Sequence, residues 1–193
     1  GSSWNKALHD GVYQGTNNTE APNFTATSLK VAAPKAGRYE LELYEKVGMG
    51  TGSMANNPWL QEMPDPITKN TWDNYLTISK ATADELGLEN WNVSNGALNG
   101  HRVNLTVNGV TLNNVPVMIQ PGQAKGTFGL ALGYGRTVGK QNMTVGVNAF
   151  PLLNGNMAIY DVKIEKAEGE HEFAATQLHH TMMGRAIVKE TTL

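Results

Sequence analysis

The sequence predicts a mainly β domain that is closed into a barrel and carries few short helices. Alternating apolar and polar runs rich in Val, Ile, Leu, Thr and Tyr recur at short intervals, and Gly, Asn and Pro turns separate them. Residues 79–86 form the one window with both a helix start signal and a helix stop signal. We therefore expect one clear helix among many strands.

The composition limits the size of the domain and the classes of partner. The chain has 193 residues with 40% hydrophobic content, enough for the core of one domain. Charged residues make up 17%, the net charge is -2 and no Lys or Arg run occurs, which disfavours nucleic acid and anionic membranes as partners. The longest apolar runs, such as VPVMI, are far shorter than the roughly 20 residues that span a bilayer. We expect no direct membrane insertion.

The chain contains no cysteine. Disulfides, thiol catalysis and Cys-ligated iron–sulfur clusters are therefore excluded within it.

Three regions are expected along the chain. Residues 1–37 read as an N-terminal extension, since they are rich in Asn, Thr, Ala and Pro and open on GSS, which resembles a tag remnant. Within them, WNKALHDGVY has enough apolar residues to dock on a neighbour. Residues 38–166 form the β-barrel, and residues 167–193 form a tail that leads to the rest of a longer parent protein. We find no internal repeat.

The barrel elements follow from local patterns. RYELELYEK (38–46) and NYLTIS (74–79) alternate as half-buried strands. The helix of SKATADELGL begins after Ser79 as N-cap and ends at Gly87. Two β-branched runs flank Asn108-Gly109, which predicts a hairpin. Further strands are expected in the segments 127–135, 143–153 and 157–167.

The segment NPWLQEMPDPITKNTWDNYLTIS (57–79) fits neither helical nor strand spacing, and its three prolines forbid a long regular element. Because its two tryptophans, Trp59 and Trp72, are costly to leave loose, we expect an ordered loop packed on a core. Its acids Glu62, Asp65 and Asp73 could bring two carboxylates together. Asp and Pro are also common turn formers, and we favour that interpretation.

Several site motifs fail on context. GTGSMA matches the G-x-G-x-x-A dinucleotide fingerprint, but Pro58 and the following prolines prevent the helix that the fingerprint needs. GYGRTVGK lacks P-loop spacing and has Gln141 where Ser or Thr would bind magnesium. Glycines and Asn in LGYGRT and GVNAF could approach a base or pterin edge, although a turn is the default for both.

The histidines give no metal or catalytic set. His179 and His180 are adjacent and would point apart, so we expect a structural or partner-facing role for them. The isolated histidines are expected at the surface: His9, His101 and His171. No Ser–His–Asp arrangement sits at a recognisable motif. The sequence therefore predicts no catalytic residue and no metal ligand.

Taken together, NNPWLQEMPDPITKNTWDNY, TADELGL, HRVNLTVNG, VPVMIQPGQAKGTFGLALGYGRT and GVNAFPLL resemble, in this order, the C-terminal molybdopterin-dinucleotide-binding domain of the DMSO reductase superfamily. The resemblance covers about residues 38–155. Within that superfamily, NPWLQEMPDPITKNTWDNY and LHHTMMGRAIVKETTL are most similar to the large iron–sulfur subunit of alternative complex III, a quinol:electron acceptor oxidoreductase.

The resemblance implies a six-stranded double-psi β-barrel and export in the folded state to the periplasm by a twin-arginine signal. In relatives that bind molybdopterin guanine dinucleotide, the corresponding loops contact the guanosine and pterin ends. The resemblance also implies that Trp59 and Leu60 anchor the loop after the first strand. By position, the cofactor-contacting residues would be Gly50, Thr51, Asn56, Asn57, Asp73, Asn74, Gly146 and Asn148.

Three functions follow as expectations. The first is a structural, cofactor-free domain of a respiratory oxidoreductase subunit, since this branch is thought to have lost the molybdenum cofactor. Its partners would be other domains of the parent chain and subunits of the respiratory complex, with iron–sulfur clusters only in the rest of the parent. The second is a domain that still binds molybdopterin guanine dinucleotide in a working molybdoenzyme. The third is a secreted β-domain that binds carbohydrate or protein through Trp59 and Trp72 exposed together.

Overall fold

A computed structural model of the chain describes residues 2–13, 15, 37–93, 97–137, 145–153, 155, 157–177 and 191. The chain divides into two compact units, residues 1–33 and 34–193, which are considered separately. The described part of the first unit contains the helix α1 (Ser2–Asp10), which the sequence patterns did not predict. Its apolar side chains Trp4 and Leu8 are exposed and lie four residues apart, on one face of the helix.

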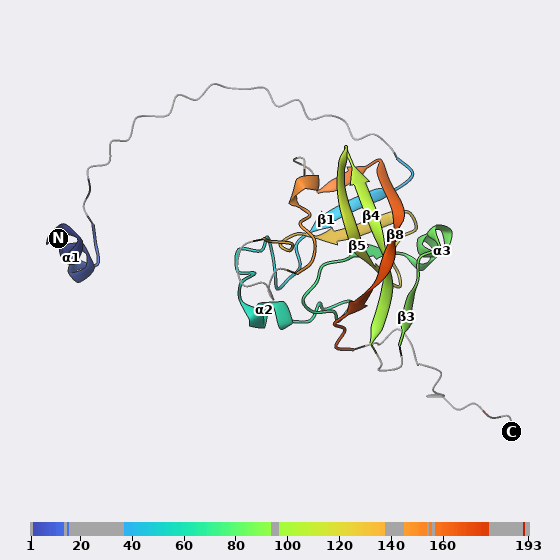
Figure 1. Cartoon of the computed structure of the whole chain (residues 1–193), viewed down its shortest axis with the longest axis horizontal. Coiled ribbons are helices and arrows are strands. Elements are labelled where there is room, and N and C mark those ends of the chain that lie inside the picture. The colour runs from blue at the N-terminus through green and yellow to red at the C-terminus, as the bar shows by residue number, and fades with distance from the viewer. Residues whose placement is uncertain are drawn as a thin grey trace. The chain divides into compact units, whose positions relative to one another are not determined.

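The second unit is mainly β, as predicted (Figure 1). Its strands are β1 (Glu40–Tyr44), β2 (Leu76–Ile78), β3 (Asn90–Asn92), β4 (Leu98–Val107), β5 (Val110–Ile119), β6 (Thr127–Ala131), β7 (Ala158–Tyr160) and β8 (Val162–Phe173). Its helices are α2 (Pro58–Glu62), α3 (Lys80–Leu86) and the short 3-10 helix η2 (Phe150–Leu152).

The strands form one mixed sheet. Its order is β3-β4-β5-β2-β6-β1-β7, and β8 pairs with β4 outside this path. Two pairs are parallel, β1 with β6 and β2 with β5, while the other pairs are antiparallel. Figure 1 shows β4 between β5 and β8, in agreement with this pairing. Among the described residues, the pairing of the strands does not close the sheet into a barrel. The closed barrel expected from the sequence is therefore not confirmed.

Local signals located several elements correctly. The turn between β4 and β5 has positive φ at both Asn108 (49°) and Gly109 (80°), as a two-residue hairpin turn of the predicted kind requires. α3 begins after Ser79, whose hydroxyl accepts a hydrogen bond from the backbone N–H of Thr82. It ends at Gly87, which adopts the left-handed conformation. The hairpin and this helix are thus confirmed.

Two predicted elements differ in the structure. In the described part of the expected strand 143–153, the chain turns and forms η2, because Pro151 cannot donate to a strand ladder and fits the first turn of a helix. The expected tail boundary at residue 166 falls inside β8, which continues pairing with β4 as far as Phe173. After β8, the backbone N–H of Thr71 donates to Ala174 O, so this stretch belongs to the folded unit.

The core follows the alternation of the strands. On β1, Leu41 and Leu43 are buried while Glu40 and Glu42 are exposed, as the period of two requires. The central strand β2 is buried throughout. The largest fully buried side chains are Tyr75, Phe128, Leu41, Leu43, Leu76, Ile78, Leu88, Leu105, Leu130 and Leu132. This core fixes the strand ends from which the candidate site is built.

Candidate functional site

Four segments meet at one end of the sheet, which we call the loop end: residues 45–57, 70–75, 132–137 and 145–149. Because β1 and β6 are parallel, the segments that follow them leave the sheet at the same end. β2 runs antiparallel to β6, so the residues that precede β2 enter at that end too. The sequence places these segments far apart, and the strand order brings them together.

Glycines allow the backbones at the loop end to touch. A Cβ on Gly52 would lie 2.5 Å from the carbonyl oxygen of Gly133, and one on Gly135 would lie 2.1 Å from the backbone nitrogen of Asn148. Both distances are far below contact range, and Gly52 and Gly135 also have positive φ (88° and 71°). The loops are therefore held in direct backbone contact.

Asn74 is the polar centre of the loop end. Its side chain is fully buried, and its Nδ2 donates to the carbonyl oxygens of Ala131 (2.8 Å) and Val147 (2.9 Å). Its Oδ1 accepts from the backbone N–H of Val147 at 2.8 Å. The amide thus joins the end of β6 to segment 145–149 and uses both of its N–H groups within the protein.

The other predicted residues near Asn74 also have internal roles. Gly146 has φ 76°, and a Cβ there would lie 2.5 Å from Asn74 Oδ1. Asn148 is exposed, and its Oδ1 accepts from the backbone N–H of Phe150 at 3.1 Å. The Oδ2 of Asp73 lies 2.8 Å from the Nε2 of His171, and both side chains are 18% exposed.

The predicted residues of segment 45–57 are bonded in a similar way. Gly50 has φ 52°, and its N–H donates to Lys46 O at 2.8 Å. Asn56 Oδ1 accepts from Arg136 Nη1 at 2.9 Å, and Asn57 caps α2 by accepting from the N–H of Trp59 at 3.1 Å. Thr51 is exposed. All eight residues predicted from the resemblance therefore belong to the loop end, and the polar side chains among them, apart from Thr51, have a protein partner.

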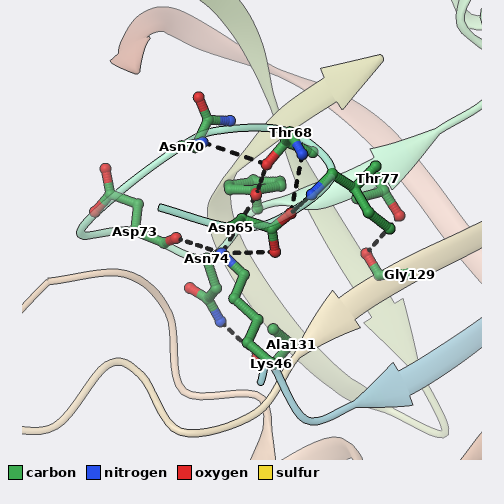
Figure 2. Close-up of polar contacts among 11 residues, drawn as sticks. Lys46, Asp65, Thr68, Asn70, Asp73, Asn74, Thr77, Gly129 and Ala131 are labelled. Carbon is green, nitrogen blue, oxygen red and sulfur yellow. Dashed lines mark hydrogen bonds and ion pairs between the residues drawn. The ribbon is translucent and has the colours of Figure 1, made fainter. Parts of the chain in front are cut away.

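A buried lysine, Lys46, lies beside Asp73 at the loop end (Figure 2). Lys46 is 8% exposed, and its Nζ donates to the carbonyl oxygen of Asp73 (3.1 Å) and to the hydroxyl of Tyr75 (3.3 Å). The Nζ also lies 4.0 Å from Asp65 Oδ2 and 4.3 Å from the centroid of the Tyr75 ring. A second ring, that of Tyr134, has its centroid 5.2 Å away. The ammonium group is enclosed by carboxylate, carbonyl and aromatic groups.

Burial dominates the electrostatics of this cluster. It lowers the pKa of the Lys46 amine from 10.5 to about 8, although the carboxylates of Asp65 and Asp73 act to raise it. Burial likewise raises the pKa of the Tyr44, Tyr75 and Tyr134 phenols above 10.0, and the negative charge of Asp65 adds to each shift. The three phenols are therefore neutral at physiological pH.

The acids of segment 57–79 differ in their surroundings. The carboxylate of Asp65 accepts hydrogen bonds at 2.9 Å from the N–H groups of Ile67 and Thr68, which makes it a turn former as predicted. It also faces Lys46. The hydroxyl of Thr68 is hydrogen-bonded to that of Tyr75. Glu62 is exposed on α2 and takes no part in this cluster.

Sequence patterns missed Lys46, His171 and Arg136 as parts of the site. Lys46 ends the alternating run 38–46 in phase with the exposed Glu40 and Glu42, where a charged residue is ordinarily solvated, so its burial had no local signal. His171 was expected at the surface, but it is partly buried against Asp73 and against the ring of Phe173. His101 is also partly buried and accepts from the N–H of Glu89, whereas His9 is exposed as expected. His179 and His180 lie outside the described residues.

The tryptophan expectations need correction. Trp59 was expected to anchor the loop, but it is 83% exposed, because it lies on the outer face of α2. Leu60 instead packs against the small cluster of Met49, Ala55, Ala131 and Tyr134. Trp72 is half-buried, and its backbone N–H donates to Gln61 O at 2.8 Å. The two tryptophans are therefore not exposed together, which disfavours the hypothesis of a domain that binds carbohydrate or protein through them.

The space beside Lys46 limits its chemistry. The hollow that Lys46 lines with Val47, Met63 and Tyr134 has a volume of about 10 Å³, room for no more than one water molecule. The amine also has three polar neighbours within 4.0 Å. The cluster thus holds an enclosed ion pair that ties β1 to the loop 65–75, and a substrate has no access to the amine in this conformation.

The described residues contain no group of three or more His, Cys, Asp or Glu side chains that could hold a metal ion. Over the same part of the chain, each helix is too short or too polar to cross a membrane. A scan against protein-family models gave no match to this chain, and a search of curated proteins found no similar sequence.

Proposed function

We propose that this chain contains a molybdopterin-dinucleotide-binding-like domain that serves as a structural, cofactor-free part of a periplasmic respiratory oxidoreductase subunit. Its role would be to support the neighbouring domains that carry electrons. The single observation on which this rests is that three polar side chains of the loop end are already hydrogen-bonded within the protein: the buried Asn74, the partly buried Asp73 and the exposed Asn56.

The arrangement of the strands supports the finer fold within this proposal, a double-psi barrel of six strands. β7 pairs with β1 and β8 pairs with β4, and one residue, Asp161, joins β7 to β8. Counting β7 and β8 as one bent strand gives a ring of six: β4, β5, β2, β6, β1 and the β7–β8 strand. In this proposal the ring is completed by the covalent chain at Asp161 rather than by a further strand pair.

The residues at the loop end do not fit a dinucleotide as a set. To read a base edge, Asn74 would have to give up hydrogen bonds to Ala131 and Val147, and leaving buried groups unpaired costs about 1–3 kcal/mol each. A ligand at Asp73 would compete with His171 in the same way. These costs favour the structural hypothesis over the cofactor-binding one, and we derive no chemical step through the cofactor.

Calorimetric titration of the chain with GMP and GDP tests the proposal. We expect no saturable heat up to millimolar nucleotide, because the polar groups of the loop end are already paired. Asn148→Ala is the matched variant, since the side chain of Asn148 is exposed and its removal leaves the buried Asn74 network intact. Saturable binding at micromolar nucleotide that disappears in Asn148→Ala would overturn the cofactor-free assignment in favour of a working cofactor site.

A further inference from the structure

The loop that covers Lys46 has a strained backbone. Residues 65–75, which we call the lid, supply the three polar neighbours of the Lys46 amine. Within the lid, Lys69 (φ 61°) and Trp72 (φ 66°) adopt the left-handed conformation although neither residue is glycine. This conformation costs free energy in a bulky residue, and residues strained in this way gather in ligand clamps and switch regions.

A buried amide adds to the cost of the closed lid. Asn70 lies on the lid (Figure 2) and is only 2% exposed. The Oδ1 of its side chain has no hydrogen-bond partner among the described residues. A buried acceptor without a partner is unfavourable, because it has lost its hydrogen bonds to water. The closed position of the lid therefore has to be maintained against both backbone strain and an unpaired polar group.

The contacts that maintain it come from residues 171–176, the end of β8 and the residues that follow, which we call the latch. The backbone N–H and the hydroxyl of Thr71 both donate to the carbonyl oxygen of Ala174, at 3.0 Å each. The backbone N–H and the hydroxyl of Thr176 donate to the carbonyl oxygen of Lys69, at 2.9 and 3.0 Å. Four hydrogen bonds thus join the latch to the lid.

Two side chains of the latch contact the lid residues that enclose the amine. The Nε2 of His171 lies 2.8 Å from Oδ2 of Asp73, and the ring of Phe173 meets that of Tyr75 edge-on, with 5.8 Å between the centroids. The Nζ of Lys46 bonds to the backbone of this same Asp73 and to the hydroxyl of this same Tyr75. Release of the latch therefore loosens the groups that surround the amine.

We propose that the lid and the latch control Lys46 as a site of acylation: the amine is enclosed while residues 171–176 hold the lid, and their release admits a small acyl donor. The neutral amine then attacks the carbonyl carbon of the donor and forms an amide, the leaving group departs, and the amine loses its proton to solvent. Ala174 and Thr176 are exposed, so the latch can be reached from solvent. This inference goes beyond the structural role proposed above and involves no nucleotide.

The test acetylates the whole chain with the N-hydroxysuccinimide ester of acetic acid at constant pH. Peptide mass spectrometry gives the rate at Lys46, and Lys80, whose side chain is 66% exposed, reports the reactivity of an open amine in the same sample. Lys46 should react at least about a hundredfold more slowly than Lys80, because only the open fraction of the molecules exposes its amine. Equal rates at the two lysines would overturn the proposal.

Matched variants test the latch itself. Thr176→Val removes one latch bond and should raise the acetylation rate of Lys46 about threefold or more. Thr111→Val is the control and should leave the rate unchanged, since Thr111 is also exposed and its hydroxyl pairs with that of Thr106 on the hairpin. Asn70→Leu removes the unpaired amide and should slow the acetylation about threefold. Equal rates in the two threonine variants would overturn the proposal, as would faster acetylation in Asn70→Leu.

Low concentrations of urea separate opening of the lid from unfolding of the whole domain. Opening of the lid exposes little surface, so the rate at Lys46 should hardly change below the unfolding transition. A rate that rises with the full urea dependence of global unfolding would overturn the proposal, because the amine would then react only in the unfolded chain.

The outcome is independent of the nucleotide titrations. Silent titrations together with a Lys46 that reacts as fast as Lys80 would overturn the lid and keep the cofactor-free assignment. Saturable GMP binding together with a latch-dependent Lys46 would do the reverse.

Discussion

Asn74 and Val147 are 73 residues apart in the chain, yet the side-chain amide of Asn74 both donates to and accepts from the backbone of Val147, at 2.9 and 2.8 Å. A third bond from the same amide reaches Ala131 at the end of β6. One buried side chain therefore joins segment 70–75, the end of β6 and segment 145–149.

Asn74→Ala should lower the free energy of unfolding by about 3 kcal/mol, because it removes three hydrogen bonds, one to the buried carbonyl of Ala131 and two to the part-buried backbone of Val147. Urea denaturation followed by circular dichroism measures the change. Asn148→Ala is the control, since its side chain is exposed and should cost at most about 1 kcal/mol. Equal losses in the two variants would contradict the central role of Asn74.

Gly146→Ala should destabilise the protein by about 2–4 kcal/mol, since the added Cβ would meet Asn74 Oδ1 at 2.5 Å in addition to the strain of φ 76°. Gly155→Ala is a close control. Gly155 has φ 74° and open space around its Cβ position, so only the strain of about 1 kcal/mol applies. Thermal denaturation of the two variants should differ clearly, and identical melting temperatures would show that segment 145–149 does not pack on Asn74.

The stability of the protein should rise between pH 7.5 and 9.5. Because burial lowers the pKa of Lys46 to about 8 from 10.5, the folded chain releases its proton in this range while the unfolded chain still binds it. Fewer protons in the folded state mean that stability increases with pH, here by about 1–2 kcal/mol. Above pH 10 the three buried phenols reverse the trend, because they stay protonated only in the folded chain.

Lys46→Met should flatten the rise between pH 7.5 and 9.5, because it removes the titrating amine and keeps a side chain of similar length. Lys80→Met is the control, since the Lys80 side chain is 66% exposed and pairs with Asp84 at the surface. Urea denaturation at several pH values gives both slopes. A rise that persists in Lys46→Met would show that another group causes it.

A double-mutant cycle on Asp73 and His171 should give a coupling energy of about 0.5–1.5 kcal/mol, because their contact at 2.8 Å lies in a partly buried position. The comparison pair is Lys80 and Asp84 on α3, whose side chains are 66% and 57% exposed. That pair should couple by about 0.3–0.5 kcal/mol. If the two cycles give the same coupling, the link between the end of β8 and the segment before β2 is no stronger than a surface ion pair.

Sequence patterns were sufficient to locate the elements whose signals lie within a few residues. Asn108-Gly109 specifies a turn with two positive φ angles, and Ser79 with Gly87 brackets α3. The alternation around Leu41 and Leu43 determines which face of β1 is buried. Each of these features depends on backbone conformation and on neighbours close in the chain, which is why patterns alone located them.

Contacts between residues distant in the chain depend on how the strands and loops are arranged in space. Lys46 is buried because the loop 65–75 covers it, and nothing near Lys46 in the sequence encodes that loop. His171 contacts Asp73 because β8 continues along β4 past the expected end of the domain. Trp59 is exposed because α2 turns Leu60 toward the small cluster at the loop end. Strand order sets these contacts, and single residues carry no signal of strand order.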